Sequence, residues 1–326
     1  MTEQQKHTAA VVGMFDGVHL GHRYLLRNLR QLAEERGLEP LVFTFPRHPM
    51  SLICPEFAPK LLSEPAEKLH LLGGSGFSVK QVNFLVFNDL LRHQTAAEFM
   101  RMLRRDYGVR LLLRGYNNRF GTERDLTPED YRRIAAAEGI ELIDDRVSFV
   151  EADGRQLDVS SSAIRKLLLA GDVAGAARLL GRPYSLSGTV VDGRKLGRQL
   201  GFPTANLSPL HKSKLIPAPG VYICNVWEPL STERGDAAAT ERGDAAPGCR
   251  YPAMLNIGHR PTVDRADSPV SIEAHLLGFE GDIYGMTLNV EFLGRLREEK
   301  KFGSVEDLTL QLAEDRKKVE KFFGLD

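Results

Sequence analysis

Two histidines, His19 and His22, are the first residues of the chain whose types and spacing could do chemistry. The apolar run 9–15 ahead of them predicts a buried strand, which Asp16 and Gly17 end before a leucine-lined helix begins. At the start of a helix, residues three apart point the same way, and the free backbone N–H groups attract anions. The stretch therefore predicts a phosphate site. The alternative is a strand-to-helix turn with two solvated histidines.

A second stretch, residues 188–206, alternates glycines with cations, namely Gly193, Arg194, Lys195, Gly197, Arg198 and Gly201. Backbone amides and guanidinium groups in such a flexible segment could hold phosphates, although no Walker A spacing is present. Pro203 stiffens the turn that follows, so Thr204 and Asn206 could both present oxygens to one Mg²⁺ ion or phosphate. A simple hairpin is the alternative.

Glu273 is the carboxylate of interest in the second half of the chain. Alternation along a predicted strand places Glu273 and His275 on the face opposite Ile272 and Ala274. A carboxylate beside a phosphate-binding flap could orient and deprotonate an attacking hydroxyl. The alternative is a solvated charge on an exposed strand face.

A run of serines marks another helix start near residue 160. Ser161 and Ser162 are good capping residues, and Arg165 falls in about the first turn, at the end that favours anions. Capping alone and an arginine that points into a site explain this pattern equally well.

The elements that must position the first set of residues alternate between strands and helices. Apolar runs predict strands at 41–45, 82–87, 109–113 and 141–143, with helices at 95–107 and 128–138 among them. This alternation predicts right-handed crossovers and a doubly wound parallel sheet. The loops 46–49 and 114–121 leave carboxyl ends of strands and are rich in polar residues, and ligands bind at this edge of such sheets.

From Ser185 onward, short apolar stretches alternate with turns, at 188–191, 220–226, 253–257, 271–277 and 288–292. Few helix signals intervene, which predicts a small antiparallel barrel. An amphipathic helix at 305–323, capped by Ser304, follows it. We therefore place the two domains at 1–183 and 184–326.

A tandem copy of Thr-Glu-Arg-Gly-Asp-Ala-Ala at 232–238 and 240–246 predicts a lengthened, mobile hairpin loop without chemistry. Lys+Arg and Asp+Glu total 43 each, which argues against a broad nucleic-acid-binding surface. Cys54, Cys224 and Cys249 lack metal-ligand spacing, so we expect reduced thiols. No apolar run approaches ~18 residues and no secretory signal is evident, so we expect a cytoplasmic protein.

These motifs resemble the bacterial bifunctional riboflavin kinase/FAD synthetase family over nearly the whole chain. The nucleotidyltransferase signatures GxFDGxHxGH, TFxPHP, GxDxxFG and SSTxIR stand at 13–22, 44–49, 115–121 and 161–165. The flavokinase signatures GxxxGRxLGFPTAN, PGVY, NIGxRPT, ExHL and RLRxExxF stand at 193–206, 219–222, 256–262, 273–276 and 295–302. There are three departures: Arg47 replaces a proline, Asn117 stands where many members have Asp, and Ala163 replaces a threonine.

The resemblance implies a Rossmann-like nucleotidyltransferase domain, followed by a small antiparallel β-barrel flavokinase domain with a C-terminal helix. In the barrel domain, Glu273 would act as base while ATP phosphorylates the ribityl 5′-hydroxyl of riboflavin to give FMN. Thr204 and Asn206 would lie at Mg²⁺ and phosphate, and the glycine-rich flap would close over the nucleotide.

In the first domain, the resemblance implies that the FMN phosphate attacks the α-phosphorus of a second ATP, giving FAD and pyrophosphate. His19, His22 and Arg165, together with Mg²⁺, would offset the negative charge on the phosphates. His48 and Asn117 would lie near the flavin or the nucleotide.

The same resemblance implies a set of residues that contact flavin and nucleotide. In the first domain they are Gly13, Phe15, Asp16, Gly17, Gly21, His48, Asn117, Ser161 and Ser162. In the second they are Gly193, Gly197, Arg198, Gly201, Pro203, Thr204, Asn206 and Arg297.

The expected partners are small molecules (riboflavin, FMN and ATP), with neither nucleic acid nor membrane, and the chain would be a monomer or weak homo-oligomer. Arg47 and Asn117 motivate an alternative, a monofunctional riboflavin kinase with an impaired adenylyltransferase half. A rival of a different class is a flavin-sensing regulator that binds without turnover. An intact Pro-Thr-Ala-Asn sequence and Glu273 argue against that rival.

Overall fold

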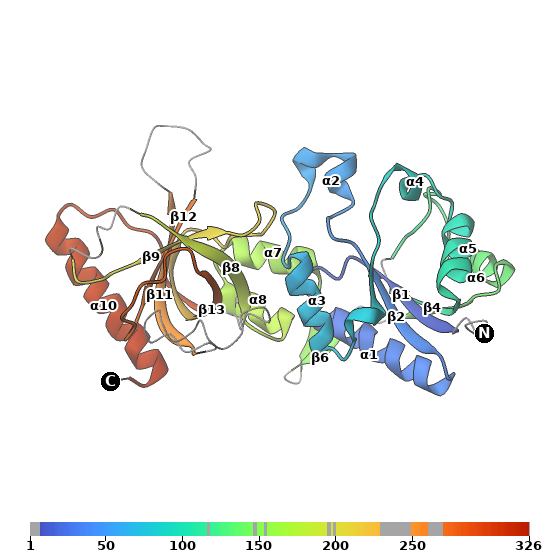
Figure 1. The fold of residues 1–326 in the computed structure, drawn as a ribbon, viewed down its shortest axis with the longest axis horizontal. Helices are drawn as coiled ribbons and strands as arrows, with labels where there is room; N and C mark the ends of the chain where they lie inside the picture. Colours follow the sequence, from blue (N-terminus) through green and yellow to red (C-terminus); the bar gives the residue numbers. More distant parts are fainter. Residues whose placement is uncertain are drawn as a thin grey trace. The chain divides into compact units, whose positions relative to one another are not determined.

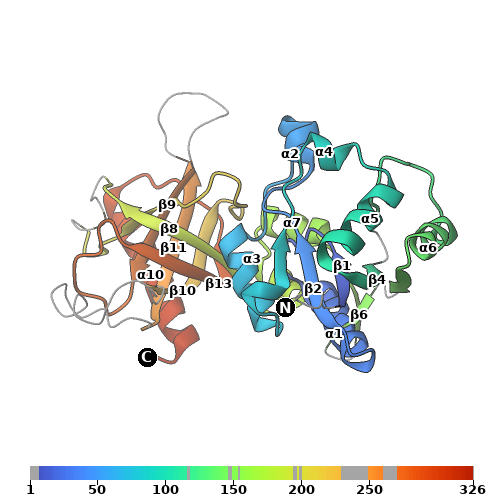
Figure 2. The same cartoon turned by 45° about the vertical axis from the view of Figure 1, so that its right-hand side comes forward.

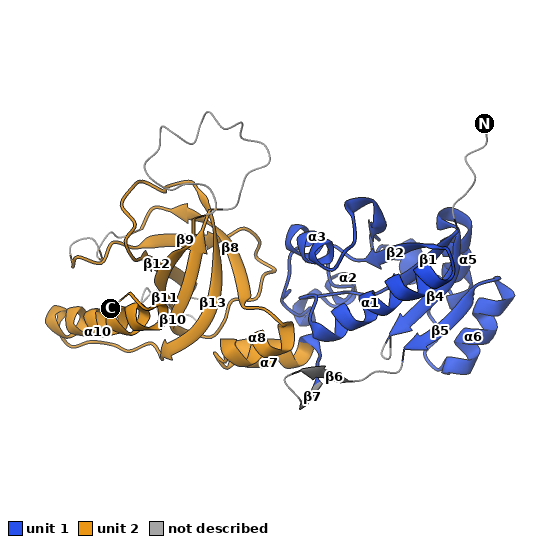
Figure 3. Cartoon of the chain, turned by 90° about the horizontal axis from the view of Figure 1, so that it is seen from below, with its two compact units in different colours: residues 1–161 blue, residues 162–326 orange. Residues whose placement is uncertain are grey.

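The computed structural model divides into two units, residues 1–161 and 162–326, coloured blue and orange in Figure 3. It describes residues 7–115, 118–145, 149–152, 155–193, 197, 200–228, 249–259 and 270–325. The predicted site residues Asn117 and Arg198 and the predicted repeat loop 232–246 lie outside these ranges. No helix within the described ranges is long and apolar enough to cross a membrane.

Five parallel strands form the sheet of the first unit, in the order β3-β2-β1-β4-β5 (Figure 1). They are β1 (Thr8–Val12), β2 (Glu39–Thr44), β3 (Val82–Phe84), β4 (Val109–Gly115) and β5 (Glu141–Asp145). All five residues of β1 are buried, as expected of a central strand in a sheet that is covered on both faces. The predicted doubly wound parallel sheet is confirmed. A short antiparallel hairpin follows it, made of β6 (Phe149–Ala152) and β7 (Arg155–Asp158).

Helices cover both faces of this sheet because alternate residues of each strand point to opposite sides. The helices are α1 (Leu20–Glu35), α2 (Met50–Ile53), η1 (Pro55–Phe57), α3 (Pro65–Gly74), η2 (Val79–Gln81), α4 (Asp89–Arg92), α5 (Ala96–Tyr107) and α6 (Pro128–Ala137). Leu29 of α1 shares one apolar core with Val11 of β1, whereas Met100 of α5 shares a second core with Ala10. In Figure 2, α3 and α5 lie on either side of β2.

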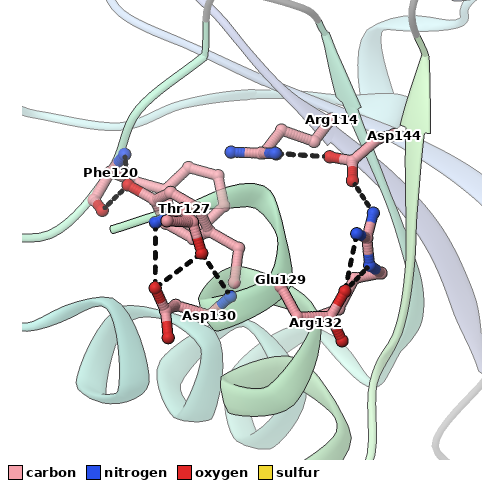
Figure 4. Close-up of polar contacts among 8 residues, drawn as sticks. Arg114, Phe120, Thr127, Glu129, Asp130, Arg132 and Asp144 are labelled. Carbon is pink, nitrogen blue, oxygen red and sulfur yellow. Dashed lines mark hydrogen bonds and ion pairs between the residues drawn. The ribbon is translucent and has the colours of Figure 1, made fainter. Parts of the chain in front are cut away.

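A buried ion-pair network joins β4, β5 and α6 (Figure 4). Arg114 and Asp144 face each other in the register of the two strands, and Arg114 Nη2 lies 2.6 Å from Asp144 Oδ1. Arg132 of α6 pairs with the second oxygen of Asp144. The side chains of Arg114 and Asp144 are only 8% and 11% exposed, so the pair is largely removed from water. This network fixes α6 on the sheet.

The second unit is a closed antiparallel barrel with strand order β10-β11-β12-β9-β8-β13, closed because β13 also pairs with β10 (Figure 1). Its strands are β8 (Tyr184–Val191), β9 (Ala205–Pro209), β10 (Gly220–Trp227), β11 (Tyr251–His259), β12 (Val270–Leu276) and β13 (Thr287–Arg297). The predicted barrel is confirmed. Large side chains such as Tyr222 and Phe292 are fully buried and pack against each other, so the barrel is filled rather than hollow.

Two helices, α7 (Ser161–Leu169) and α8 (Val173–Leu180), precede the barrel in the chain. Contacts group them with the barrel in the second unit, and β8 begins at Tyr184, where the barrel domain was predicted to start. The Ala218 N–H donates to the Leu168 carbonyl at 3.0 Å, which ties α7 to a barrel loop.

The predicted C-terminal helix, α10 (Val305–Phe323), packs against the outer wall of the barrel, and Ser304 caps it by accepting from the Asp307 N–H at 3.1 Å. Val319 of α10 shares an apolar cluster with Ile223 of β10 and Met254 of β11. The wall beneath α10 is therefore a second buried surface of the barrel, separate from its filled interior.

We expect Asp144→Ala to lower the free energy of unfolding by ~3–5 kcal/mol, because it leaves the buried Arg114 without its carboxylate. Chemical denaturation followed by circular dichroism measures this loss. The control is Glu141→Ala on the same strand, whose carboxylate pairs with Arg36 and is 47% exposed. Removing that surface pair should cost at most ~1 kcal/mol. Equal losses of unfolding free energy in the two variants would show that the buried network stabilises the fold no more than the exposed ion pair does.

Candidate active sites

The segment between β1 and α1 turns tightly before it presents the two predicted histidines. Phe15 and Val18 have φ angles of 46° and 39°, in the left-handed region that residues with side chains rarely adopt. His19 is the N-cap of α1, and its Nδ1 accepts a hydrogen bond from the His22 backbone N–H at 3.3 Å. Its Nδ1 is thus an acceptor, so the proton of a neutral His19 ring lies on Nε2. The sequence pattern did not reveal this capping role.

The structure brings the two predicted imidazoles into contact at the start of α1. Their ring centroids lie 3.6 Å apart with planes inclined by 16°, and the Phe15 ring meets His22 edge-on at 5.2 Å. Burial lowers the pKa of His22 well below its ordinary value, and the nearby His19 and Lys68 lower it further. At pH 7, therefore, the His22 ring is neutral. Its buried Nδ1 has no hydrogen-bond partner within the described part of the chain.

Asp16 and Gly17, both predicted to contact ligands, anchor this turn to the segment ahead of α3. The buried Asp16 carboxylate accepts hydrogen bonds from the Leu62 and Ser63 backbone N–H groups, each at 3.0 Å. The Gly17 N–H donates to Ser63 Oγ at 2.8 Å. These contacts hold the strained backbone in place, and direct contact of the two residues with a ligand stays a prediction.

Lys68 is a residue of this region that the sequence interpretation missed. It lies on α3 with 0% exposure, and its Nζ donates to the carbonyl oxygens of Met14 and Phe45, both at 2.8 Å. Its spacing in the sequence could have revealed it. Lys68 lies four residues before the buried Leu72, so both occupy one face of the helix. A lysine in the buried stripe of a helix indicates a cation with specific oxygen partners.

Residues at the start of α7 approach the same turn. Ser161 Oγ donates to the Asp16 carbonyl oxygen at 3.0 Å. A Cβ atom on Gly21 would lie 3.3 Å from the His19 ring and 3.7 Å from the Val159 carbonyl oxygen, so glycine leaves room for this approach. Two other predicted residues follow along the chain: the exposed Ser162, and Arg165 one turn further on α7.

Two more predicted residues of the first unit have local structural partners. His48 Nδ1 accepts a hydrogen bond from the Met50 backbone N–H at 3.2 Å, at the start of α2. A Cβ atom on Gly13 would lie 3.1 Å from the Phe15 ring, so glycine lets that ring fold back over the turn.

In the loop after β4, the residues that follow the predicted Asn117 are anchored at two points. The Asn118 side-chain amide donates to the Val12 carbonyl oxygen at the end of β1, a contact that sequence reasoning did not anticipate. The Tyr131 hydroxyl of α6 donates to the Phe120 carbonyl oxygen at 2.9 Å, and Figure 4 shows Phe120 beside the capped start of this helix. The loop is therefore held at the carboxyl edge of the sheet, where ligands bind in such folds.

In the second unit, the predicted carboxylate Glu273 stands in a row of polar side chains on the outer wall of the barrel. The register pairs Glu273 of β12 with Asn206 of β9 and with Asn256 of β11. Directly paired residues of antiparallel strands point to the same side, so the three side chains are neighbours. Ile272 and Ala274 are buried on the opposite face, as the alternation predicted.

A pocket of about 230 Å³ opens beside this row, between the barrel wall and α10. Its apolar lining consists of Leu200, Phe202, Val221, Met254, Phe302, Leu308 and Leu312. Its other lining residues are Gly197, Thr204, Asn256, Glu273, His275, Arg297, Glu299 and Lys300. An apolar wall with a few convergent polar groups suits a flat aromatic ring system that carries a polar chain.

The predicted glycine-rich segment lies close against the turn that carries Thr204 and Asn206. A Cβ atom on Gly193 would fall 2.0 Å from the Asn206 amide nitrogen. One on Gly197 would fall 3.3 Å from Thr204 Oγ1 and 2.3 Å from the Phe202 carbonyl oxygen. Both glycines therefore act by letting the two segments approach closely.

His275 fixes this turn to the strand that carries Glu273. Its Nδ1 lies 2.8 Å from the carbonyl oxygen of the predicted Pro203, and its ring packs edge-on against Phe202 at 5.5 Å. Burial lowers the pKa of His275, although the hydrogen bond to Pro203 works in the opposite direction. The ring is thus neutral at pH 7 with its proton on Nδ1. The predicted Gly201 has a φ angle of 80°, which glycine adopts at no steric cost.

Arg297, a predicted contact residue, is held in the pocket wall by a buried carboxylate of α10. Asp315 is 0% exposed, and its Oδ2 accepts from Arg297 Nε and Nη2 at 2.9 and 2.8 Å. Gln311 Nε2 donates to the other oxygen of Asp315 at 3.2 Å. Two N–H groups of the guanidinium thus share one carboxylate oxygen. This contact fixes the guanidinium plane and attaches α10 to the end of β13.

A second pocket of the same unit, of about 480 Å³, shares Thr204 with the first. It is lined by Val190, Pro203, Thr204, Ala205, Ala274, Leu276 and residues 279–284. Thr204 therefore lies where two cavities of ligand size adjoin.

Comparison with known proteins gives both units a family. The sequence profile of FAD synthetases matches residues 1–163, and that of riboflavin kinases matches residues 180–323. A bifunctional riboflavin kinase/FMN adenylyltransferase of Pseudomonas fluorescens is 37% identical over 313 residues, which are 96% of this chain and 92% of that protein. The chain belongs to the bifunctional riboflavin kinase/FMN adenylyltransferase family.

Further comparisons extend over the same length. The bifunctional riboflavin kinase/FMN adenylyltransferase of Bacillus subtilis is 32% identical over 329 residues, covering 99% of this chain and 94% of that protein. A crystal structure from Streptococcus pneumoniae, described as a macrolide-efflux protein, superposes with a TM-score of 0.78 at 31% identity. The superposition covers 95% of this chain and 93% of that one.

Membership of the riboflavin kinase/FMN adenylyltransferase family confirms the resemblance seen in the sequence. The bifunctional prediction is confirmed over the alternative of a riboflavin kinase alone, because both domains match. Flavins and ATP are the small molecules on which this family acts. The roles of individual residues stay predictions.

We expect Gly193→Ala to displace the Asn206 amide and to lower riboflavin phosphorylation on the order of 100-fold, the usual effect of a misplacement of about 1 Å. FAD formation from supplied FMN should not change, because that reaction belongs to the other unit. The control is Gly303→Ala, where the nearest atom would lie 4.0 Å from the new Cβ. Chromatographic separation of riboflavin, FMN and FAD measures both activities. Wild-type kinase activity in Gly193→Ala would show that phosphorylation does not depend on the close approach of Gly193 to Asn206.

Proposed function

We propose that the second unit transfers the γ-phosphoryl group of ATP to the ribityl 5′-hydroxyl of riboflavin, giving FMN and ADP. The first unit then joins FMN to the AMP part of a second ATP, giving FAD and pyrophosphate. The observation that carries this proposal is the row of Asn206, Glu273 and Asn256 beside an apolar pocket and a glycine-lined turn. One wall thus offers a base, phosphate contacts and a surface for a flavin ring.

In the kinase reaction, Glu273 accepts or orients the proton of the 5′-hydroxyl. Phosphoryl transfer passes through a loose transition state, so catalysis comes mainly from positioning and charge compensation. Asn206 and Asn256 flank Glu273 in the strand register, so their amides are neighbours of the carboxylate. As the oxygen of the hydroxyl bonds to the γ-phosphorus, its proton passes to Glu273 and the β–γ bridging oxygen leaves with ADP.

The two adjoining pockets suit the two substrates. The isoalloxazine ring packs in the apolar pocket against Met254 and Leu312, and the ribityl chain runs toward Glu273. The adenine nucleotide lies in the pocket that Leu276 and residues 279–284 line. Thr204 borders both pockets, so the γ-phosphate meets the hydroxyl beside it.

Thr204 and Asn206 are the residues that would hold Mg²⁺ together with the ATP phosphates. Their hydroxyl and amide oxygens are hard ligands, and Gly193 and Gly197 let the glycine-rich segment approach Asn206 and Thr204 closely. Mg²⁺ takes few protein ligands and keeps several waters, so one hydroxyl and one amide oxygen would suffice beside the phosphates. When bound, Mg²⁺ offsets the negative charge on the phosphates.

In the adenylyl transfer, no strong base is needed because the FMN phosphate is already ionised. Its oxygen bonds to the α-phosphorus of ATP as the bond to the β-phosphate oxygen breaks and pyrophosphate leaves. The start of α1 offers backbone N–H groups and its dipole, and the neutral His22 adds a hydrogen bond from its ring. Arg165 contributes the full positive charge that a neutral imidazole lacks.

Other expectations go with this proposal as predictions. The cytoplasm is the expected location, and the chain is expected to be a monomer or a weak homo-oligomer. Asn117 and His48 are expected near the flavin or the nucleotide of the first unit.

We expect Glu273→Gln to lower the kcat of riboflavin phosphorylation by ~10²–10⁴-fold, because the amide keeps the shape of the side chain but cannot accept the proton. Binding of ATP should persist, since the nucleotide pocket is unchanged, and calorimetric titration measures it. FAD formation from supplied FMN serves as the internal control. Kinase activity near the wild-type value would rule out Glu273 as the base.

We expect the double variant His19→Ala/His22→Ala to make FMN from riboflavin but to lose FAD formation by at least ~100-fold, as loss of oxyanion-type hydrogen bonds does. The matched control is His70→Ala/His93→Ala, which removes two exposed histidines of the same unit. An end-point assay with riboflavin and Mg-ATP separates the two products. Simultaneous loss of both activities would indicate misfolding instead of a missing adenylyl site.

A further inference from the structure

The ammonium group of Lys68 lies where the two strands at the centre of the first unit end. It donates to the carbonyl oxygen of Met14, two residues beyond β1, and to that of Phe45, one residue beyond β2, both at 2.8 Å. A third contact, at 3.4 Å, reaches Thr44 Oγ1, which itself donates to the Met14 carbonyl at 3.0 Å. One buried cation therefore ties two separate strand ends together.

The segment that Lys68 ties down is the strained turn that carries the site. Phe15 and Val18 have positive φ angles. Residues with such a strained backbone conformation persist only where contacts with the surrounding structure hold them in it. Lys68 holds the Met14 end of this turn, while Asp16 holds its middle through Leu62 and Ser63. All of these anchoring groups come from residues 62–68. This short segment thus fixes the path of the chain toward the histidine pair of α1.

We propose that Lys68 is a positioning residue for adenylyl transfer, whose buried ammonium group holds the ends of β1 and β2 so that His19 and His22 face the phosphates. The inference rests on the proposed function of the first unit. Lys68 itself contacts main-chain oxygens and not the reacting atoms, so it acts through the turn.

The charge of Lys68 responds to pH within an accessible range. Burial lowers its pKa to about 8, although Asp16 raises it. Besides Asp16, the titratable group that interacts with it is His22 on α1, whose pKa Lys68 lowers. Below pH 8 the ammonium has three N–H donors for the three oxygens of Met14, Phe45 and Thr44, and above pH 8 the neutral amine has only two.

The direction in which stability changes with pH, as Lys68 loses its proton, separates a positioning role from a merely structural one. The folded pKa of about 8 lies below the ordinary value of 10.5, so the unfolded chain binds more protons between these values. This group therefore adds to stability as pH rises from about 8 toward 10.5. A loss of FAD formation over this range would reflect the geometry of the turn and not unfolding caused by Lys68.

The first test uses the full-length wild-type chain from pH 7 to 9.5. We expect the kcat of FAD formation from supplied FMN to fall above pH ~8, where Lys68 loses its proton, while riboflavin phosphorylation in the same sample does not follow that fall. The melting temperature, measured at each pH, should not fall in step. A flat FAD profile across this range would overturn the proposal.

The second test compares Lys68→Met, Lys68→Arg and the control Lys80→Met, which removes an exposed lysine of the same unit. We expect Lys68→Met to lower the kcat of FAD formation about 100-fold, with KM for ATP near wild type, because the ligand groups remain but are misplaced. Lys68→Arg keeps a charge above pH 12. It should therefore recover part of the activity and lose the fall above pH 8.

Wild-type FAD formation in Lys68→Met would overturn the proposal, and so would a Lys68→Arg profile that still falls at pH 8. If Lys68→Met does not fold, seen as loss of kinase activity as well, the wild-type and Lys68→Arg pH profiles decide whether the proposal stands. If the histidine double variant makes FAD normally, the proposed function of the turn itself fails, whatever Lys68 does.

Discussion

The first unit depends on the contact between one buried ammonium group and the main-chain carbonyl oxygens at the ends of β1 and β2. Parallel strands leave such oxygens unpaired where they end, and a buried oxygen without a partner is costly. Lys68 supplies partners for Met14 and Phe45 at once. The chain can then turn through Phe15 and Val18 in a conformation that side chains normally avoid. The strained turn and the buried charge are therefore parts of a single arrangement.

The second unit is subject to a different constraint, which likewise fixes the position of its candidate site. Side chains such as Tyr222 and Phe292 are fully buried in the interior of its barrel. The row of Asn206, Glu273 and Asn256 lies on the outer wall, where a strand alone offers one face to water. α10 supplies the opposite face, and Asp315 and Arg297 lock it there. Glu273 thereby stands in a pocket instead of on an open surface.

The periodic spacing of apolar residues in the sequence was sufficient to predict the architecture of both units. Alternation with a period of two correctly placed Ile272 and Ala274 inside the barrel and Glu273 on the opposite face, because one face of each strand must be buried. Contacts between distant segments were not predictable. Lys68 meets a carbonyl 54 residues away, and His275 meets one 72 residues away. A periodic pattern reports which face of an element is buried, but not what lies against it.

The attachment of α10 has a consequence for how this enzyme can change. Among the described residues, α10 contacts the barrel through side chains, whereas every barrel strand is also bound to its neighbours through its main chain. Exchanging Leu308 or Leu312 would reshape the pocket without altering any strand ladder or the spacing of the polar row on the barrel wall. The shape of this pocket can thus change on one helix, independently of Asn206, Glu273 and Asn256.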